Sequence, residues 1–155
     1  MDGETLGRLR QSVERARLES RHAIHALSGT PRQGLREALA DAVTAAAERF
    51  HAEVEIAPMP EVELTAARAE ALVRIACEAV TNAARHSGAG RVRLSLEDAG
   101  RHVRLRVRDA GCGFEVAAGG EGFGLAAMRE RARSVGGEVR ISSVPGRGSE
   151  VEAAL

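Results

Sequence analysis

Two neighbouring runs of alternating residues limit what this chain can fold into. In residues 91–97 (RVRLSLE) and 102–109 (HVRLRVRD), apolar side chains take every second position, and most positions between them are arginine. A period of two is typical of a β-strand with one buried and one exposed face. The DAGR sequence between the runs predicts a turn, so the runs should form an antiparallel hairpin. A sheet with one charged face can carry helices only on the other face.

The remaining sequence supplies the elements for such a two-layer arrangement. Two further runs flank PGRG and predict a closing hairpin, and the run AEVEIAP predicts a short strand. We therefore expect an α+β protein, a two-layer α/β sandwich in which helices cover one face of a mixed sheet. The expected helices are residues 35–50, 66–86 and 123–135, and the expected strands are 52–58, 91–97, 102–109, 138–144 and 149–155.

The beginning of the chain follows a heptad pattern. Apolar and small residues recur at alternating steps of three and four between Leu6 and Leu27, which predicts a helix over residues 5–27. Two interpretations are open: an amphipathic helix packed on its own domain, or one helix of a dimeric bundle. The sequence SGTPRQG that follows contains Gly and Pro and predicts a hinge.

Charge and composition exclude several classes of function. All 22 basic residues are arginine, and they balance 22 acidic residues, so a nucleic-acid binder held mainly by phosphate contacts is not expected. Cys77 and Cys112 form no motif and are expected to be free thiols in a reducing compartment. No apolar run approaches the ~20 residues that span a bilayer, and no secretory signal opens the chain. We expect a cytoplasmic protein without membrane contact.

A polar stripe marks the expected helix 66–86, for which Thr65 is the predicted N-cap. Glu78, Asn82 and Arg85 recur at i, i+4 and i+7, about 120° round the helix from its apolar stripe. Carboxylate and amide oxygens suit Mg²⁺, and a guanidinium can pair with phosphate. The alternative is a solvated helix face with ordinary i, i+4 contacts.

The sequence RDAGCGF places an aspartate at the end of the second alternating run. Asp109 offers only acceptors and could receive the exocyclic amine of a purine. Gly111 and Gly113 would permit a positive φ and a close approach of a flat ligand to the backbone. The alternative is a plain Asp-Gly turn.

The sequence EGFGL opens the expected helix 123–135 with two glycines, and Gly136 and Gly137 predict a glycine cap at its C-terminal end. Gly122 and Gly124 would leave backbone N–H groups uncovered at a helix N-terminus, where phosphate binds readily. The alternative is a flexible loop followed by a helix. A single GxG is a weak signal, so the order of the three motifs carries more weight than any one of them.

In that order, the motifs resemble a known family. Residues 78–87 (EAVTNAARHS), 109–114 (DAGCGF) and 122–137 (GFGLAAMRERARSVGG) resemble the N box and the two glycine boxes of the ATP-binding catalytic domain of two-component sensor histidine kinases. That domain has the Bergerat fold shared with gyrase-type ATPases. The Glu at the head of the N box and the short lid look like the nitrate-sensor and lipid-thickness-sensor kinases. The resemblance covers residues 35–155.

The resemblance implies roles at the phosphate end of an ATP site. Asn82 would coordinate the Mg²⁺ that bridges the triphosphate. Glu78 would support that ion through water or act as a base, and Arg85 and His86 would lie near phosphate. The lid would be residues 112–121, followed by a hinge and a phosphate-facing helix end formed by Gly122, Gly124 and Leu125.

The resemblance also implies roles at the nucleoside end. Asp109 would bind the adenine amine, and Gly111 and Gly113 would shape the adenine pocket. Ser149 stands where the family usually has a threonine hydroxyl near the base. Cys112 is expected only to fill space in the lid.

One part of a sensor kinase is missing from the sequence. His22 and His25 lie too close to Asn82 to precede a complete helical hairpin, and neither is followed by the expected Asp. Residues 1–29 instead resemble the second helix of the phosphoacceptor hairpin, and residues 30–155 the ATP-binding domain. The resemblance implies partners: a phosphoacceptor helix, the receiver domain of a response regulator, and a second copy in the homodimeric parent. The fragment itself should bind Mg-ATP without efficient autophosphorylation.

Two other functions fit the same motifs. An anti-sigma-type serine kinase would use the same pocket and bind a protein partner through its outer helices. The heptad pattern before the hinge argues against it, because such kinases need no bundle helix. A non-catalytic nucleotide-binding interaction module would require decayed motifs, whereas the motif residues here are intact.

Overall fold

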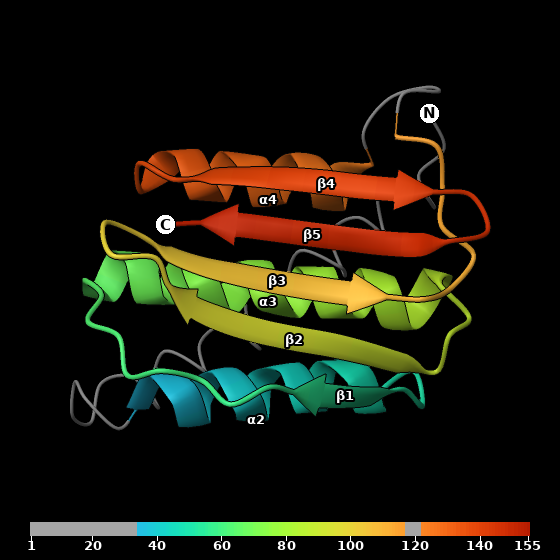
Figure 1. Ribbon diagram of the computed structural model, residues 1–155, viewed down its shortest axis with the longest axis horizontal. Helices are drawn as coiled ribbons and strands as arrows, with labels where there is room; N and C mark the ends of the chain where they lie inside the picture. Colours follow the sequence, from blue (N-terminus) through green and yellow to red (C-terminus); the bar gives the residue numbers. More distant parts are fainter. Residues whose placement is uncertain (1–33, 117–121) are drawn as a thin grey trace, which may run out of the picture.

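The computed structural model describes residues 34–116 and 122–155 of the chain. The expected helix 5–27, its assignment as a remnant of a hairpin, and part of the expected lid lie outside the described residues. The described residues form two layers, with a five-stranded sheet on one side and the helices together on the other (Figure 1). The predicted α+β, two-layer fold is confirmed.

The helices fall close to their predicted ranges: α2 is Gly34–Glu48, α3 is Ala66–His86 and α4 is Phe123–Ser134. Helix α2 begins one residue earlier and ends two residues earlier than expected. Its last turn closes early, because the Phe50 and Ala52 amides both donate to the carbonyl of Ala47. No helix in the described ranges combines the length and apolar character needed to cross a membrane.

The ends of α3 and α4 follow the predicted capping chemistry. The hydroxyl of Thr65 accepts a hydrogen bond of 3.3 Å from the Arg68 amide, which confirms Thr65 as the N-cap of α3. Helix α4 stops before Gly136, whose φ of 76° lies in the left-handed region that glycine adopts at little cost. The amide of Gly137 then donates to the carbonyl of Ala132 at 2.8 Å.

The sheet has the strand order β1-β2-β3-β5-β4. Strand β1 runs parallel to β2, and all other neighbours are antiparallel, so the sheet is mixed as predicted and both hairpins are confirmed. The central strand β3 ends at Asp109, which pairs with Ser149 of β5. The strands are β1 (Glu53–Ile56), β2 (Arg91–Asp98), β3 (Val103–Asp109), β4 (Glu138–Val144) and β5 (Gly148–Ala154).

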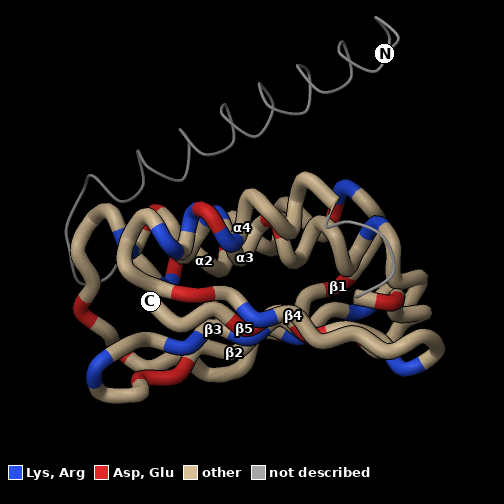
Figure 2. Tube along the Cα trace, turned by 90° about the horizontal axis from the view of Figure 1, so that it is seen from above, with Lys and Arg blue, Asp and Glu red and all other residues tan. Residues whose placement is uncertain are grey.

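The two faces of the sheet differ as the alternation predicts. The face under the helices is apolar and supplies much of the core, in which Leu94 and Leu105 are fully buried against residues such as Leu72 of α3. The other face carries arginines and carboxylates, and none of the described helices lies over it (Figure 2). Asp109 and Ser149 continue the odd-numbered, helix-facing rows of β3 and β5, so they belong to the side of the sheet that faces the helices.

Ion pairs organise the outer face of the sheet. Arg106 donates to Glu97 at 2.8 Å and to Glu152 at 2.9 Å, which links three neighbouring strands. The hydrogen bond from Arg106 lowers the pKa of Glu152 below its usual value, since it favours the ionised carboxylate. Arg108 pairs with Glu150 on the same face. Charges on this face are therefore matched within the described residues that form it.

Candidate functional site

The middle of α3 meets the beginning of α4 at Gly124. A Cβ atom at this glycine would lie 2.3 Å from Oε1 of Glu78 and 3.1 Å from Nδ2 of Asn82. Both α3 side chains are half-buried, and in the described part of the chain no hydrogen bond or ion pair holds either of them. The structure therefore brings three of the predicted site residues together, and their carboxylate and amide groups stay available to a ligand.

Helix α4 begins without a side-chain cap. Gly122 is its N-cap residue and has no side chain to accept from the first amides, although its carbonyl accepts from the Leu125 amide at 3.1 Å. A helix of twelve residues has uncompensated N–H groups and a partial positive charge at this end. Because Gly124 lies in the same turn, these amides lie close to Glu78 and Asn82. A phosphate-sized anion would find donors there.

Arg131 adds a positive charge to this contact between α3 and α4. Burial lowers the pKa of its guanidinium, and repulsion from Arg74 adds to that effect, whereas Glu78 and Glu70 act in the opposite direction. Arg74 is itself bonded to Glu70 at 2.7 Å. The sequence analysis missed Arg131, because on α4 it is one of several arginines and only the packing of the two helices brings it near Glu78.

Asp109 uses one carboxylate oxygen to stabilise a turn and leaves the other available to a ligand. Its Oδ1 atom accepts a 2.9 Å hydrogen bond from the amide of Gly111, which is the Asp-Gly turn expected from the sequence. A carboxylate has acceptor capacity on both oxygens, so Oδ2 can still receive a donor from a ligand. The turn and the ligand-binding interpretation are therefore compatible.

The two glycines after Asp109 are required by close contacts with backbone atoms. A Cβ atom at Gly111 would lie 2.1 Å from the carbonyl oxygen of Ser87, at the end of α3. Gly113 has a φ of 59°, and a Cβ atom there would lie 2.1 Å from the carbonyl oxygen of Val144. The loop is thus pressed against α3 on one side and against the β4–β5 turn on the other.

Cys112 bonds this loop to both neighbours. Its amide donates to the carbonyl of Ser87 at 2.9 Å and its thiol to the carbonyl of His86 at 3.2 Å, while its own carbonyl accepts from the Gly146 amide at 2.7 Å. The expectation that Cys112 only fills space is therefore wrong. Neither Cys112 nor Cys77 is in a disulfide, as predicted.

These contacts place the loop after Asp109 and the residues around Gly124 at two points along α3. Ser87 anchors the loop that follows Asp109, and Asn82 and Glu78 lie about 7.5 Å and about 13.5 Å further back at the helical rise of 1.5 Å per residue. Such a line suits an extended ligand with one end at the loop and the other at α4. The side chains of Arg85 and His86 are exposed at the end of α3, and their contact with phosphate stays a prediction.

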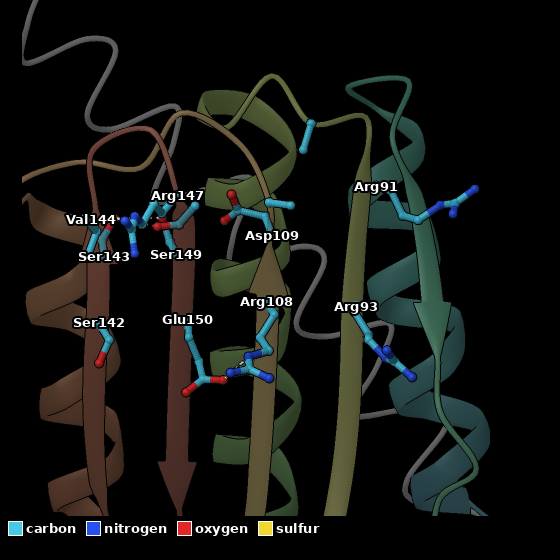
Figure 3. A pocket seen from close by; sticks show the side chains of 13 residues that line it. Arg91, Arg93, Arg108, Asp109, Ser142, Ser143, Val144, Arg147, Ser149 and Glu150 are labelled. Carbon is cyan, nitrogen blue, oxygen red and sulfur yellow. Dashed lines mark hydrogen bonds and ion pairs between the residues drawn. The ribbon is translucent and has the colours of Figure 1, made fainter.

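A depression of about 540 Å³ lies at this end of the sheet, and Figure 3 shows its lining. Asp109, Ser143 and Ser149 contribute to it, but so do Arg93 and Arg108 of the outer face. The residues gathered around Gly124 do not line it. The depression is therefore lined by residues from both faces of the sheet at this end, and it shares Asp109 and Ser149 with the predicted nucleoside end.

The described residues contain no ready-made metal centre. Within the described ranges, no group of three or more His, Cys, Asp and Glu side chains could hold a metal ion. Glu78 and Asn82 supply two oxygen donors, which suits Mg²⁺, an ion that keeps several waters and often takes ligands from substrate phosphates. The donors present therefore fit a metal that arrives with a phosphate-bearing ligand.

The fold and the arrangement of the motifs define an ATPase-type domain. The family model for histidine kinase-, DNA gyrase B-, and HSP90-like ATPases matches residues 67–155. This range contains α3, the loop after β3, and α4, which carry the three motifs. The chain belongs to this family.

Two of the curated relatives that the chain resembles are a sensor histidine kinase and a sensor protein. The chain is 39% identical over 82 residues to the sensor histidine kinase LiaS of Bacillus subtilis (strain 168), an alignment that covers 52% of this chain and 23% of LiaS. It is also 39% identical over 82 residues to the sensor protein VraS of Staphylococcus aureus (strain COL), covering 52% of this chain and 24% of VraS. The chain therefore matches about a quarter of the length of these relatives.

Solved structures support the same fold. The histidine kinase domain of the blue-light activated histidine kinase from Erythrobacter litoralis EL346 superposes with a TM-score of 0.75 at 18% identity, over 90% of this chain and 72% of that one. A longer structure of the same kinase gives a TM-score of 0.80 at 20% identity, over 100% of this chain and 51% of that one. At these identities the likeness shows the fold alone.

Proposed function

We propose that the chain binds Mg-ATP and, within an intact parent kinase, transfers the γ-phosphate to a histidine. The observation that carries the proposal is the packing of Gly124 against Glu78 and Asn82. It joins an uncapped helix N-terminus to two oxygen donors on α3, the helix against which the loop after Asp109 is packed. Membership of a family of ATPases and the similarity to sensor kinases support the same conclusion.

In this proposal the nucleoside lies at the loop after β3. Oδ2 of Asp109 accepts the exocyclic amine of adenine, while Oδ1 keeps its bond to Gly111. Ser149, the cross-strand neighbour of Asp109, presents its hydroxyl to the base. The close approach of Gly111 to Ser87 keeps the loop thin enough for a flat ring to lie against the backbone.

The triphosphate then lies along α3 toward α4. Asn82 and Glu78 hold the magnesium ion, which when bound neutralises phosphate charge and polarises the γ-phosphoryl group. The uncapped amides of Gly122 and Gly124 orient phosphate oxygens, while the Leu125 amide bonds to the Gly122 carbonyl and holds this helix end in place. Arg85 and His86 lie near the phosphates. The protein contributes mainly positioning and electrostatic stabilisation, because a phosphoryl transfer of this type requires little covalent chemistry from side chains.

The remaining steps need parts outside the described residues. A histidine on a phosphoacceptor helix receives the phosphate, and the receiver domain of a response regulator takes it onward, within a cytoplasmic homodimer of the parent. The similarity to LiaS and VraS, which are a sensor histidine kinase and a sensor protein, supports this assignment. A separately supplied fragment that carries a phosphoacceptor helix should become phosphorylated in the presence of the chain and Mg-ATP.

Calorimetry with a non-hydrolysable ATP analogue tests the proposal. We expect saturable binding with Mg²⁺, weaker binding when the metal is chelated, and at least a tenfold loss in Asn82→Ala with Mg²⁺ present, since one metal ligand is removed. Thr81→Ala, at the neighbouring half-buried position of α3, is the matched control and should bind like the parent. No binding at millimolar nucleotide would end the proposal. Equal binding by the parent and Asn82→Ala would favour a module with a decayed site.

A further inference from the structure

Three charged residues follow one another along α3 at the spacing of adjacent helical turns. Glu70, Arg74 and Glu78 lie at i, i+4 and i+8, so Arg74 can reach a carboxylate on either side of it. All three residues are half-buried. Arg131 of α4 belongs to the same cluster, because Arg74 lowers and Glu78 raises the pKa of its guanidinium. The cluster therefore contains the carboxylate that the proposed function assigns to the metal.

The charges of this cluster are paired unequally. Arg74 bonds to Glu70 at 2.7 Å, whereas Glu78 has no hydrogen bond or ion pair among the described residues. The direction of the helix explains the choice, because a carboxylate four residues before a cation makes a better pair than one four residues after it. Nε of Arg74 is buried and has no hydrogen-bond partner in the described part of the chain. Without Glu70, Glu78 would be the next carboxylate within reach of Arg74.

We propose that Glu70 is a positioning residue that holds Arg74 away from Glu78 and thereby keeps the Glu78 carboxylate free for a magnesium–phosphate ligand. This inference rests on the proposed function. Glu70 lies eight residues before Glu78, which is about 12 Å at the helical rise of 1.5 Å per residue, so its effect on the ligand passes through Arg74. A pair between Arg74 and Glu78 would occupy one of the two oxygen donors of the phosphate end. The nucleoside end, at Ser87, would keep its contacts.

The effect of charge alone has the opposite sign, which makes the inference testable. Removing the Glu70 carboxylate takes away a negative charge on the side of α3 that a triphosphate would approach. Coulomb repulsion alone therefore predicts slightly tighter binding of the anion. A released Arg74 that pairs with Glu78 predicts weaker binding, because the ligand must first break the new ion pair. Ligands without phosphate should not respond to either effect.

Calorimetry with Mg²⁺ and a non-hydrolysable ATP analogue, and separately with adenosine, tests the inference. We expect Glu70→Gln to bind the analogue about two- to fivefold more weakly, the strength of a partly exposed ion pair, with adenosine binding unchanged. Glu70→Arg should weaken it further, because the new guanidinium repels Arg74 toward Glu78. Glu130→Gln is the matched control. It removes a carboxylate that lies 4.0 Å from Arg133 in an exposed pair on α4, and it should weaken neither ligand.

A double variant shows whether Glu70 acts through Arg74. Methionine keeps an apolar stem without the charge, so Glu70→Gln with Arg74→Met should bind the analogue as Arg74→Met alone does. Unchanged or tighter binding by Glu70→Gln, an equal loss for adenosine, or the same loss when Arg74 is absent would overturn this inference and leave the proposed function standing. Should Glu70→Arg fail to fold, Glu70→Gln and the double variant decide. Failure of the parent to bind the analogue would overturn the proposed function, and this inference with it.

Discussion

The two ends of the predicted nucleotide site are built differently. The nucleoside end is held by backbone contacts: Cys112 bonds to the end of α3 and to the β4–β5 turn, and Gly111 and Gly113 touch carbonyl oxygens. The phosphate end is held by the packing of one glycine, Gly124, against the tips of two side chains. The first end is complete without a ligand, and the second has groups that a ligand could organise.

This difference predicts that the same substitution has different consequences at the two ends. A methyl group added against a backbone carbonyl forces the main chain to move, which costs stability. A methyl group added against the end of a glutamate side chain only turns that side chain aside, which costs little stability but moves a group needed for function. Glycine substitutions at the two ends therefore test this difference directly.

The largest expected effect is that of Gly113→Ala on stability. The new Cβ would lie 2.1 Å from the carbonyl oxygen of Val144, on a residue with a φ of 59°. Overpacking and the left-handed backbone together should lower the free energy of unfolding by about 3 kcal/mol or more. Urea unfolding followed by circular dichroism measures it. A loss below about 1 kcal/mol would mean that the loop is not held as described.

Gly124→Ala should instead separate function from stability. Alanine is favoured over glycine in a helix, so the free energy of unfolding should change by less than about 1 kcal/mol. The displaced Glu78 carboxylate should weaken Mg-ATP binding by a factor on the order of ten to thirty, while adenosine binding stays the same, because adenosine has no phosphates.

Calorimetry with both ligands measures this separation. Gly122→Ala is the comparison variant, since a Cβ there would meet nothing within 4 Å, and it should lose much less affinity for Mg-ATP. Equal losses of ATP and adenosine affinity in Gly124→Ala would show that the two ends are not separable.

Asp109→Asn tests the nucleoside end with a smaller change. The amide can keep an oxygen bonded to the Gly111 amide, so the turn survives, but the charged acceptor for the adenine amine is lost. ATP should bind about tenfold more weakly and ITP should lose less, because an amide N–H can donate to O6. Competition between the two nucleotides measures the ratio, and an unchanged preference for ATP would remove Asp109 from its assigned role.

The smallest expected effect lies on the outer face, away from both ends. Because Arg106 lowers the pKa of Glu152, the carboxylate stabilises the fold above its unfolded pKa of about 4.5, and this stability is lost as the pH falls through the lowered folded value. Glu152→Gln should cost up to about 1 kcal/mol at pH 7 and less at pH 3. Urea unfolding at both pH values checks the sign. A larger cost at the lower pH would contradict it, and nucleotide affinity should not change.

Much of the fold could be predicted because local patterns and packing agree. The alternation in β2 and β3 set which side chains are buried, and Thr65 and Gly136 marked helix ends with side-chain and backbone chemistry that acts over a few residues. The end of α2 was less predictable, because the hydrogen bonds that close its last turn depend on the path of the chain toward β1.

Site residues could be predicted where they belong to a sequence motif. They could not be predicted where only the packing of distant segments brings them together. Asn82, Asp109 and Gly124 stand in motifs whose residue types suggest their chemistry. Arg131 has no such signal, because the charged groups that act on it lie on another helix. Cys112 was misjudged for the same reason: its bonds reach segments before and after it that only the fold brings close.

The most direct test of the account is to locate the ATP analogue on the protein by NMR. The account predicts that a saturating analogue with Mg²⁺ shifts the backbone amides of Gly111, Gly113 and Gly124 together, since one ligand lies along α3 between the two ends. Shifts confined to the outer-face part of the depression, around Arg93 and Arg108, would contradict it.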